Sequence, residues 1–387
     1  MQPLLRTPLT PRPYIGQLAT RCRIPTSLFD FGSSVTFTSR TYHFARDTIT
    51  ALQVALPNWY VNRTIFPKLE AASGNSLTLA ASIEYPVGVF TQLKFGGAAT
   101  IAAASGTTTW TDLARVYIPR GAKFYVRIAY TGRFIPMCIA ADNVSSGAVT
   151  STYLNEAQGD AIQAGSDLTM SGTLTNTEAD WCGPLAIVGP TRRPSFALIG
   201  PSLVHGVDDT ATGDDSGDMG EMARSVGPTH AYINFGVSGL AAVEYTLAAY
   251  PRSFELHRYC SHVMSLIGAT DIVDNDTTAA DALALERAVW DHLAPRPIHV
   301  CTLNFCDVGA GPEAQRIAYN ASVRSRPLPT AGYFEIADAV ETARDSGVWI
   351  SGYTTDGVHP DVDGHLAIKN FGGINLRRIG AHVYHMR

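Results

Sequence analysis

The spacing of apolar residues changes near residue 190, and this change limits which folds are open to the chain. Between about residues 33 and 190, apolar and polar residues alternate with a period of two, as in "SVTFTSRTYHF" and "AKFYVRIAYTG". Gly, Pro, Asn and Ser interrupt the alternation at intervals of roughly ten residues, which is typical of an antiparallel β-sandwich. After "GPTRRPS" (189–195), short apolar runs alternate with stretches of helical spacing. This second pattern favours a parallel sheet covered by helices.

The two patterns predict two domains in this chain of 387 residues, a length that exceeds one ordinary domain. We expect an N-terminal extension at 1–32, an all-β sandwich of jelly-roll type at 33–190 and an α/β domain at 191–387. In the α/β domain, the pattern predicts strands at 196–200, 230–236, 260–268 and 297–305, and helices at 218–227, 240–250 and 277–293. Sites in such folds form at the carboxyl ends of the parallel strands, so chemistry is expected where these strands end.

Composition argues against several classes of function. The formal net charge of −5 gives no reason to expect nucleic acid or an anionic membrane as a partner. No apolar run reaches the roughly 20 residues needed to span a bilayer. Prolines interrupt "MQPLLRTPLTPRPYIG" at the N-terminus, where a signal peptide needs a continuous apolar region. We therefore expect a soluble protein that is cytoplasmic or is released by a route without a signal peptide. The six cysteines are scattered, so buried free thiols are expected.

Small-residue turns follow three of the predicted strands. The first strand runs into "GPS" (200–202), the second into "NFGVSG" (234–239) and the third into "GATD" (268–271). A serine at the end of a buried strand is a common place for a nucleophile, and small residues let the backbone approach a ligand closely. These turns are therefore the candidate walls of a site.

A third polar group comes late in the chain, where Asp356 precedes His359 by three residues in "DGVHPD". An acid so close to a histidine can orient the imidazole by a hydrogen bond while the second ring nitrogen faces outward. Ser202, His359 and Asp356 therefore form a candidate catalytic triad. Each of the three signals is weak alone, and their joint occurrence in this order is much stronger.

These motifs resemble the sequence blocks of the SGNH (GDSL-type) hydrolases, over roughly residues 195–387. The stretch "ALIGPSLVHG" is similar to the first block, in which Gly-Asp-Ser follows the first strand. "NFGVSG" is similar to the second block, "IGATDI" to the third, usually Gly-x-Asn-Asp, and "DGVHPD" to the fifth, which is Asp-x-x-His-Pro. The resemblance implies a serine esterase with a flavodoxin-like, three-layer α/β/α domain and with no metal or organic cofactor.

The resemblance also assigns roles to individual residues. It implies that Ser202 is the nucleophile, His359 the general base and Asp356 the acid that orients it. The N–H groups of Ser202 and Gly236 and the side chain of Thr270 would form the oxyanion hole.

Two positions depart from the family pattern. Proline replaces the aspartate of the first block at position 201, and threonine replaces the asparagine of the third block at Thr270. Pro201 loses only its own N–H and suits the first turn of a helix, so the N–H of Ser202 survives. Thr270 is the more serious change, because losing one oxyanion donor typically costs about 10²–10³ in turnover. We expect an enzyme that is slow or tuned for easy esters.

Other polar and aromatic residues near these motifs have ordinary structural explanations. His205 is expected to be a satisfied histidine of the core or surface, and Asp271 to brace the loop beside Thr270. The acidic run is expected to be a solvated loop rather than a calcium site, since its spacing does not match an EF-hand; it contains Asp208, Asp209, Asp214, Asp215 and Asp218. The aromatic residues of the first half that could stack on sugars are expected to be core residues; they are Trp59, Tyr60 and Trp110.

The sequence therefore predicts an esterase that removes small acyl groups, acetyl first, from a carbohydrate. The carbohydrate is expected only because a β-sandwich joined to such a hydrolase resembles the arrangement of carbohydrate esterases. Two alternatives stay open. One is a catalytically weak or silent fold that binds glycan or serves as a structural module, and the other is a lipase-like or thioesterase activity on longer chains. The sequence gives no oligomeric state.

Overall fold

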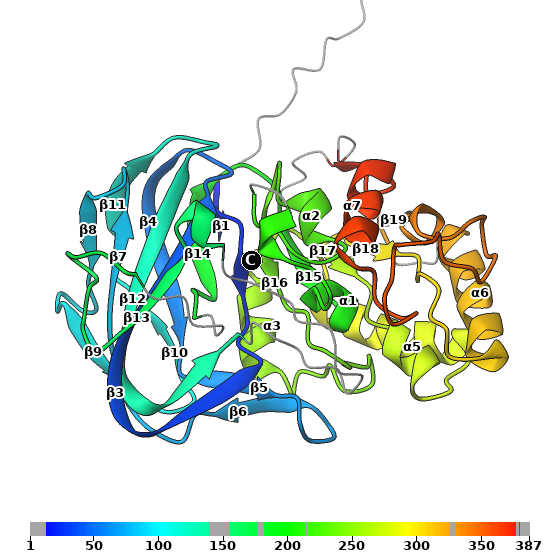
Figure 1. Ribbon diagram of the computed structural model, residues 1–387, viewed down its shortest axis with the longest axis horizontal. Coiled ribbons are helices and arrows are strands. Elements are labelled where there is room, and N and C mark those ends of the chain that lie inside the picture. Colours follow the sequence, from blue (N-terminus) through cyan, green and yellow to red (C-terminus); the bar gives the residue numbers. More distant parts are fainter. Residues whose placement is uncertain are drawn as a thin grey trace, which may run out of the picture.

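A computed structural model describes residues 13–138, 155–175, 182–213, 216–325, 330–376 and 379. Two antiparallel sheets lie on the left of Figure 1, and a parallel sheet with most of the helices lies on the right. The chain is therefore of mixed α/β class. No helix in these described ranges is long and apolar enough to cross a membrane.

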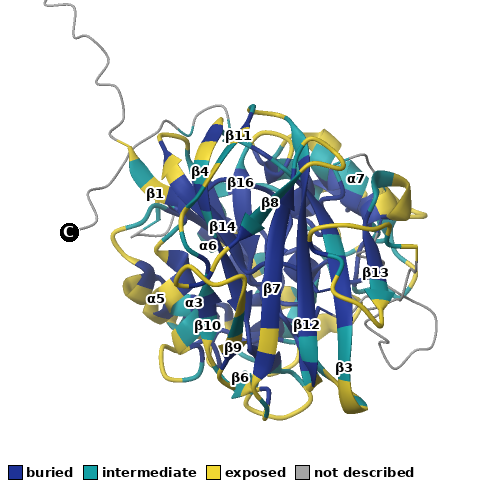
Figure 2. Ribbon diagram, turned by 90° about the vertical axis from the view of Figure 1, so that its left-hand side faces the viewer, coloured by how far each residue is buried: buried dark blue, intermediate teal, exposed yellow. Residues whose placement is uncertain are grey.

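The antiparallel sheets contain most of the first half of the chain. The first sheet has the order β1 (Tyr14–Gln17), β14 (Ala186–Thr191), β4 (Ile49–Pro57), β10 (Thr108–Trp110), with β11 (Ala114–Ile118) also paired to β4. The second has the order β13 (Ala161–Ala164), β3 (Ser27–Phe44), β12 (Lys123–Met137), β7 (Leu77–Glu84), β8 (Phe90–Leu93), with β9 (Thr100–Ala103) also paired to β7. Figure 2 shows the middle of β7 and β12 buried. Their β-branched and aromatic side chains suit a buried pleated surface.

The parallel sheet has the order β19 (Gly332–Phe334), β18 (Ile298–Cys301), β17 (His262–Ser265), β15 (Ser195–Ile199), β16 (Ala231–Asn234), β2 (Cys22–Arg23). The predicted strands of the second half are confirmed, although each is shorter than its apolar run. The strand order reverses beside β15, because β16 lies on one side of it and β17 on the other. Ligands of open parallel sheets bind at such a reversal, outside the carboxyl ends of the strands.

The helices of the second half and the short 3-10 turns complete the fold. The α-helices are α1 (Ser202–His205), α2 (Ala223–Val226), α3 (Pro251–His257), α4 (Ala269–Val273), α5 (Ala279–Leu293), α6 (Ala310–Arg324) and α7 (Val362–Phe371). The 3-10 turns are η1 (Glu156–Gln158), η2 (Ala211–Gly213) and η3 (Ala337–Ala339). Helix α5 matches the predicted helix at 277–293, and Thr278 caps it by accepting a hydrogen bond from the N–H of Asp281.

The predicted helix at 240–250 is wrong, because this segment forms turns. Some of its backbone donors go to carboxylates, and others go to carbonyls three residues earlier, such as Glu244 to Ala241 and Tyr245 to Ala242. Asp271 accepts from the N–H of Ala242 at 2.6 Å, and Glu244 accepts from the N–H of Ala241 at 3.0 Å. Hydrogen bonds that span three residues, with no continued ladder of bonds that span four, close turns rather than an α-helix.

The stretch predicted as an N-terminal extension takes part in three sheets, since β3 of the second antiparallel sheet begins at Ser27. Strand β1 pairs antiparallel with β14, and β2 pairs parallel with β16 through Cys22 opposite Ile233. A two-stranded hairpin, β5 (Trp59–Asn62) and β6 (Leu69–Ala72), reaches from the first half toward the second. The buried apolar side chains of both halves form one continuous cluster. All six cysteines are free and buried, as predicted.

Candidate active site

Strand β15 delivers Ser202 to the end of the parallel sheet. The strand ends at Ile199, Gly200 and Pro201 form the turn, and helix α1 begins at Ser202. A Cβ on Gly200 would lie 2.5 Å from Cγ2 of Val204, so only glycine lets the helix pack back on the strand. Pro201 has φ −80°, close to the angle that its ring imposes. Because the N–H of Ser202 makes no hydrogen bond within the described ranges, the proline leaves that donor available.

The loop before helix α7 brings His359 and Asp356 to the same place. His359 Nε2 lies 2.8 Å from Ser202 Oγ, and His359 Nδ1 lies 2.7 Å from Asp356 Oδ2. An ionised carboxylate can only accept, so Nδ1 carries the proton and Nε2 of the neutral ring accepts from the serine hydroxyl. The structure thus brings together the serine, histidine and aspartate that the sequence singled out.

Asp356 is held as a carboxylate by its own loop. Its Oδ1 accepts from the N–H groups of Val358 and His359, both at 2.8 Å. Burial alone would raise the pKa of Asp356, but the hydrogen bonds from the His359 ring and from these two N–H groups outweigh it. The pKa of Asp356 therefore lies well below its usual range. A carboxylate that stays ionised keeps the imidazole in one tautomer and one orientation.

The structure does not support the predicted oxyanion role of Gly236. Its N–H already donates to Oδ1 of Asn234 at 2.7 Å, while the amide of Asn234 donates to the carbonyl of Val204 at 2.8 Å. A Cβ at this glycine would lie 2.4 Å from the backbone nitrogen of His205. Gly236 is therefore needed for the close contact between its loop and helix α1, and its N–H is taken.

Sequence reasoning missed the next glycine of the same motif. Gly239 has φ +68°, a conformation that favours glycine, and its N–H donates to no described residue. Its loop is tied to the nucleophile turn because the N–H of Val237 donates to the carbonyl of Gly200 at 3.1 Å. The signal was present in the sequence as the second glycine of "NFGVSG".

Thr270 and Asp271 lie in the first turn of helix α4. Thr270 is buried, and its hydroxyl forms no hydrogen bond with the described residues. Asp271 accepts from the N–H groups of Ala242 and Val243, as a brace of the neighbouring loop would. Burial raises the pKa of Asp271, and the two N–H groups partly offset this.

The expectation of a solvated acidic loop at 208–218 is wrong for the three acids that the structure describes. Asp209 is fully enclosed and forms an ion pair of 2.5 Å with Arg224, and Asp218 accepts from the hydroxyl of Tyr232. Asp208 is also buried. The remaining two acids of the run, at 214 and 215, lie outside the described residues. The ion pair with Arg224 offsets the cost of burying the charge of Asp209.

Asp208 lies beside the two residues that position the serine. One oxygen of Asp208, one oxygen of Asp356 and one ring nitrogen of His359 lie within 4.8 Å of one another. Within the described ranges this is the one group of His, Cys, Asp and Glu with a spacing that could hold a metal ion. Sequence reasoning assigned Asp208 no role at the site.

Of the remaining sequence candidates, His205 and Trp59 lie in the core, whereas Tyr60 and Trp110 are only half-buried. His205 is fully buried, and its Nδ1 lies 3.0 Å from the carbonyl of Gly236 and 2.9 Å from a nitrogen of Arg23. Trp59 is also fully buried and donates to Thr108. Trp110 and Tyr60 are half-buried, and Trp110 packs on Tyr259.

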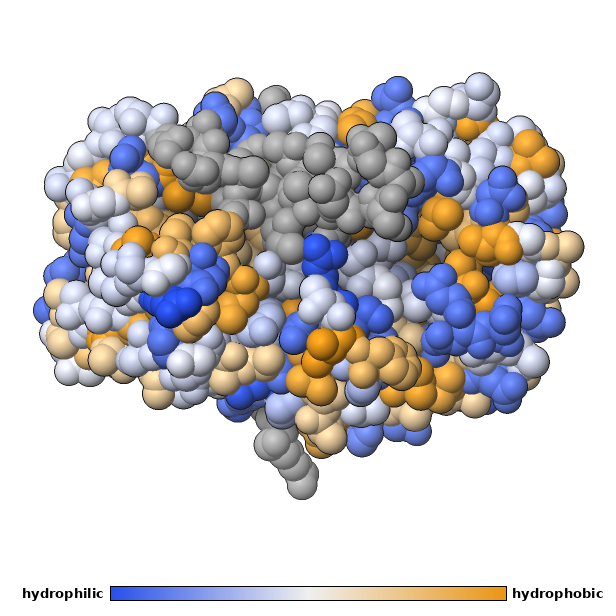
Figure 3. All heavy atoms as spheres, turned by 60° about the horizontal axis from the view of Figure 1, so that its bottom comes forward, coloured by the Kyte–Doolittle hydropathy of each residue, from blue (hydrophilic) through white to orange (hydrophobic). Residues whose placement is uncertain are grey.

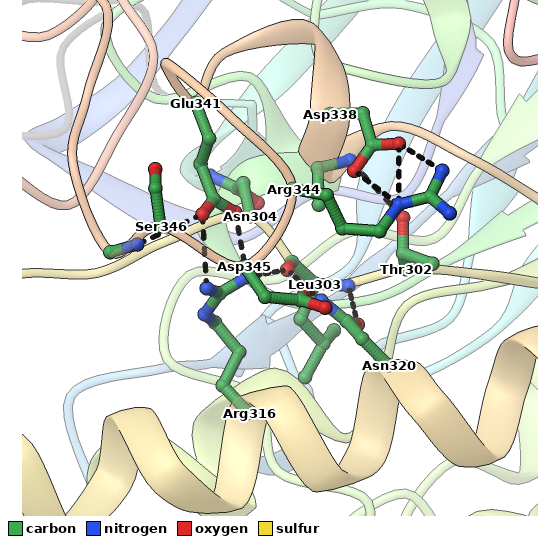
Figure 4. Close-up of polar contacts among 12 residues, drawn as sticks. Thr302, Leu303, Asn304, Arg316, Asn320, Asp338, Glu341, Arg344, Asp345 and Ser346 are labelled. Carbon is green, nitrogen blue, oxygen red and sulfur yellow. Dashed lines mark hydrogen bonds and ion pairs between the residues drawn. The ribbon is translucent and has the colours of Figure 1, made fainter.

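The segment after β18 contacts the loop that carries Asp356 and His359. The N–H of Asp307 donates to the carbonyl of Gly357 at 2.8 Å. Figure 4 shows how helix α6 fixes this segment: Asn320 bonds both the N–H and the carbonyl of Leu303, and Arg316 reaches the same carbonyl. Arg316 also pairs with the buried Glu341 at 2.7 Å. Side chains that satisfy buried backbone groups in this way hold a loop in one position.

The β5–β6 hairpin borders the site from the other half of the chain. Lys68 pairs with Glu244 at 3.3 Å and also donates its N–H to that carboxylate at 2.7 Å. A Cβ on Gly239 would lie 3.2 Å from Cε of Lys68, so the lysine covers this glycine. Figure 3 brings forward the side on which Figure 1 shows β5 and β6, and there hydrophilic and apolar side chains are intermixed.

Comparison with known proteins gave likenesses among solved structures. No protein-family model matches the chain, and no curated protein matches it. Structures similar to it include GDSL-family and carbohydrate-esterase proteins. A family two carbohydrate esterase from Clostridium thermocellum, solved with cellohexaose, is 10% identical, with 95% of this chain and 99% of that chain covered and a TM-score of 0.37.

Two further structures cover only part of this chain. The carbohydrate acetylesterase Est24 from Sinorhizobium meliloti is 12% identical, with 49% of this chain and 100% of that chain covered and a TM-score of 0.36. A lipolytic protein of the G-D-S-L family from Desulfitobacterium hafniense, described as putative, is 12% identical, with 47% and 99% covered and a TM-score of 0.34. These TM-scores are all below 0.5, so the likenesses say nothing about the chemistry of the site. That chemistry is inferred from the side chains of this chain.

Proposed function

We propose that the chain is a serine hydrolase of carboxylic esters, with Ser202 as nucleophile, His359 as general base and Asp356 as the acid that orients the base. One observation carries the proposal: Ser202 Oγ lies 2.8 Å from His359 Nε2, and the other nitrogen of that ring lies 2.7 Å from a carboxylate. A nucleophile, a base and an orienting group in hydrogen-bond contact are what acyl transfer requires.

The reaction divides into two steps of the same kind. Ser202 Oγ attacks the ester carbonyl while His359 Nε2 takes the hydroxyl proton, and the resulting imidazolium gives that proton to the departing alcohol. The acyl group is then bound to Ser202. A water molecule attacks this acyl-enzyme, His359 takes a proton from the water, and the proton returns to Ser202 as the carboxylic acid leaves.

Three donors would stabilise the negative oxygen of each tetrahedral intermediate. The N–H of Ser202 and the N–H of Gly239 make no hydrogen bond with described residues, and both lie on the turns that flank the serine. The hydroxyl of Thr270 would be the third. Gly239 replaces Gly236 in this proposal, because the N–H of Gly236 is already bonded to Asn234. Preorganised donors of this kind each contribute about 10²–10³ in turnover.

We further propose that the fold is of the SGNH type, with a flavodoxin-like three-layer α/β/α domain and a jelly-roll sandwich. The strand order β16-β15-β17-β18-β19 supports the first part, since it is the 2-1-3-4-5 order of that fold. The two antiparallel sheets support the second. The division at residues 32 and 190 remains a proposal.

For the substrate we propose a small acyl ester, acetyl first, on a carbohydrate. The charged groups beside the site favour a polar alcohol over a lipid. Lys68 and Glu244 form an ion pair next to Gly239. Burial raises the pKa of Asp274, and the nearby Lys68 and His359 partly offset this. Long acyl chains would need an apolar groove there instead.

The proposal is tested with p-nitrophenyl acetate and the variant Ser202→Ala. We expect turnover to fall at least about 10³-fold, because removing the nucleophile disables the triad as a unit. Ser322→Ala, on the outer side of helix α6, is the matched control and should keep wild-type turnover. Equal rates for wild type and Ser202→Ala would contradict the proposal.

A covalent readout makes the test independent of the choice of ester. A fluorophosphonate probe should add its phosphonyl group to Ser202 with loss of fluoride, and peptide mass spectrometry locates the adduct. Rates for acetyl and octanoyl esters then test the acyl group, since a preference for octanoyl would contradict the small-acyl proposal.

A further inference from the structure

The loop after the nucleophile helix turns back toward the histidine. Gly206 ends helix α1 with φ +92°, and its N–H donates to the carbonyl of Ser202 at 2.8 Å. The carbonyl of Val207 lies 3.4 Å from Nε2 of His365 on helix α7. Asp208 follows with φ +66°. These contacts fix the loop against the helix that the His359 segment leads into.

The carboxylate of Asp208 is enclosed and without a hydrogen bond. The residue is 5% exposed, and neither carboxylate oxygen bonds any described residue. One of its oxygens lies within 4.8 Å of a ring nitrogen of His359 and of an oxygen of Asp356. A buried carboxylate without partners costs several kcal/mol when it is ionised. Asp208 lies beside His359, and the positive charge that this ring gains on taking a proton would offset that cost.

The charges that face Asp208 come from the loop before helix α7 and from its cap. They are His359, which favours the ionised carboxylate, and Asp356 and Asp361, which oppose it. Asp361 also caps helix α7 by accepting from the N–H of Gly364 at 3.0 Å. Burial is the largest influence and raises the pKa of Asp208 to about 6. Asp208 is therefore mainly ionised at pH 7 and above.

We propose that Asp208 is a second acid of the site, a positioning residue that acts through His359 and stabilises the imidazolium formed when the ring takes the proton of Ser202. The proposal rests on the esterase function above. Asp356 holds the ring by a direct hydrogen bond, whereas Asp208 acts through space, with no hydrogen bond to the ring. Two carboxylates thus lie within 4.8 Å of the ring. Asp274 is a third acid in its neighbourhood: burial raises the pKa of Asp274, and Lys68 and His359 partly offset this.

Two consequences follow from Coulomb's law. A unit charge about 5 Å from the ring, at the effective dielectric constant of a protein, shifts protonation equilibria by one pH unit or more. Removing the charge of Asp208 makes the imidazolium less stable. The acidic limb of kcat/KM should then move to lower pH, because the neutral base survives to lower pH, and the plateau kcat should fall, because the transition state loses a neighbouring anion.

The test is Asp208→Asn, which keeps the shape of the side chain and tolerates the positive φ. With p-nitrophenyl acetate, we expect the acidic limb to move down by about one pH unit and the plateau kcat to fall about tenfold, with KM within about twofold. Asp208→Gly, which also accepts this φ, should show the same shift and serves if the Asn variant folds poorly. Asp363→Asn, an exposed acid in the first turn of helix α7, is the matched control and should leave the profile unchanged.

The competing outcomes are distinct. A folded Asp208→Asn variant with the wild-type pH profile would overturn the proposal. A second outcome would also overturn the proposal. Micromolar Zn²⁺ would inhibit wild type but not Asp208→Asn, and the two pH profiles would be equal, which would assign the cluster to a metal.

A measurement without turnover separates this proposal from the esterase function. The protonation midpoint of the His359 ring, followed by NMR in wild type and in Asp208→Asn, should be lower in the variant. If the midpoint moves while wild type hydrolyses no ester, the electrostatic role stands and the esterase proposal fails. If esterase activity is present and the midpoint does not move, the role of Asp208 fails alone.

Discussion

At the scale of single residues, Gly236 holds the two turns of the site in contact. A Cβ added there would meet the backbone nitrogen of His205 at 2.4 Å and the carbonyl carbon of Val204 at 2.7 Å. Backbone cannot move aside as a flexible side chain can, so the loop and helix α1 would have to separate.

Gly236→Ala should therefore destabilise the protein by about 3 kcal/mol and lower kcat, because Ser202 moves with helix α1. Gly311→Ala is the control: no atom lies within 4 Å of its added Cβ, and it lies within helix α6, where alanine is favoured by up to about 1 kcal/mol. Urea denaturation of both variants checks the prediction. Equal stability of Gly236→Ala and wild type would show that the turns can separate at little cost.

The same scale shows what the sequence could predict of the site. Ser202, Asp356 and His359 were found because strand ends and short spacings are visible in a sequence. The sequence could not show that Gly239 is a better oxyanion donor than Gly236. Whether the N–H of Gly236 is already bonded depends on where the side-chain amide of Asn234 points. Asp208 was placed in a solvated loop because burial of a charge depends on tertiary packing that no local pattern encodes.

At the scale of elements, the β5–β6 hairpin is fastened to helix α3 by Glu70. Its buried carboxylate accepts from the N–H of Arg252 at 2.9 Å and from the N–H and hydroxyl of Ser253, both at 2.7 Å. The two N–H groups are free first-turn donors of the helix, which a carboxylate satisfies well. The fastening also places Lys68, two residues earlier, against Gly239.

Glu70→Ala should lower the free energy of unfolding by about 3 kcal/mol, since it leaves several buried donors unpaired. It should also loosen the hairpin, so limited proteolysis should cut the 63–67 tip faster, and KM for an acetylated sugar should rise more than kcat falls. Glu156→Ala, an exposed acid on η1, is the control. A hairpin that resists protease in the Glu70 variant would contradict the fastening.

Elements were predicted well where periodicity is strong and poorly where side chains capture backbone donors. Helix α5 has a regular apolar spacing and was found. The turns at 240–250 have a composition that suits a helix, but most of their backbone bonds span three residues, and Asp271 and Glu244 accept from the N–H groups of Ala242 and Ala241. Asp271 follows Ala242 by 29 residues, so no local sequence pattern connects the two.

At the scale of the whole molecule, the second half is incomplete without the first. Strand β2 is the outer neighbour of β16, and Arg23 on it contacts both the ring and the carbonyl of His205. A fragment of residues 191–387 would leave β16 as an exposed, apolar sheet edge. The pairing of β2 could not be predicted, since two residues carry no periodicity.

We therefore expect the 191–387 fragment to aggregate or to remain unfolded, whereas the full chain should fold. Size-exclusion chromatography and amide NMR dispersion distinguish these outcomes. A monomeric, well-dispersed fragment would show that β2 is dispensable, and would support a domain boundary at residue 190.

The place of β2 in the chain also bears on how the protein is made. A ribosome releases Cys22 and Arg23 long before Ile233 and Asn234, the residues they pair with. During that interval the antiparallel strands β3 to β14 emerge while β2 has no partner in the parallel sheet. The pairing of β2 with β16 thus joins an early segment to one that is made after all the antiparallel strands. A pause in translation between the two would lengthen the time in which β2 can pair with a neighbouring nascent chain.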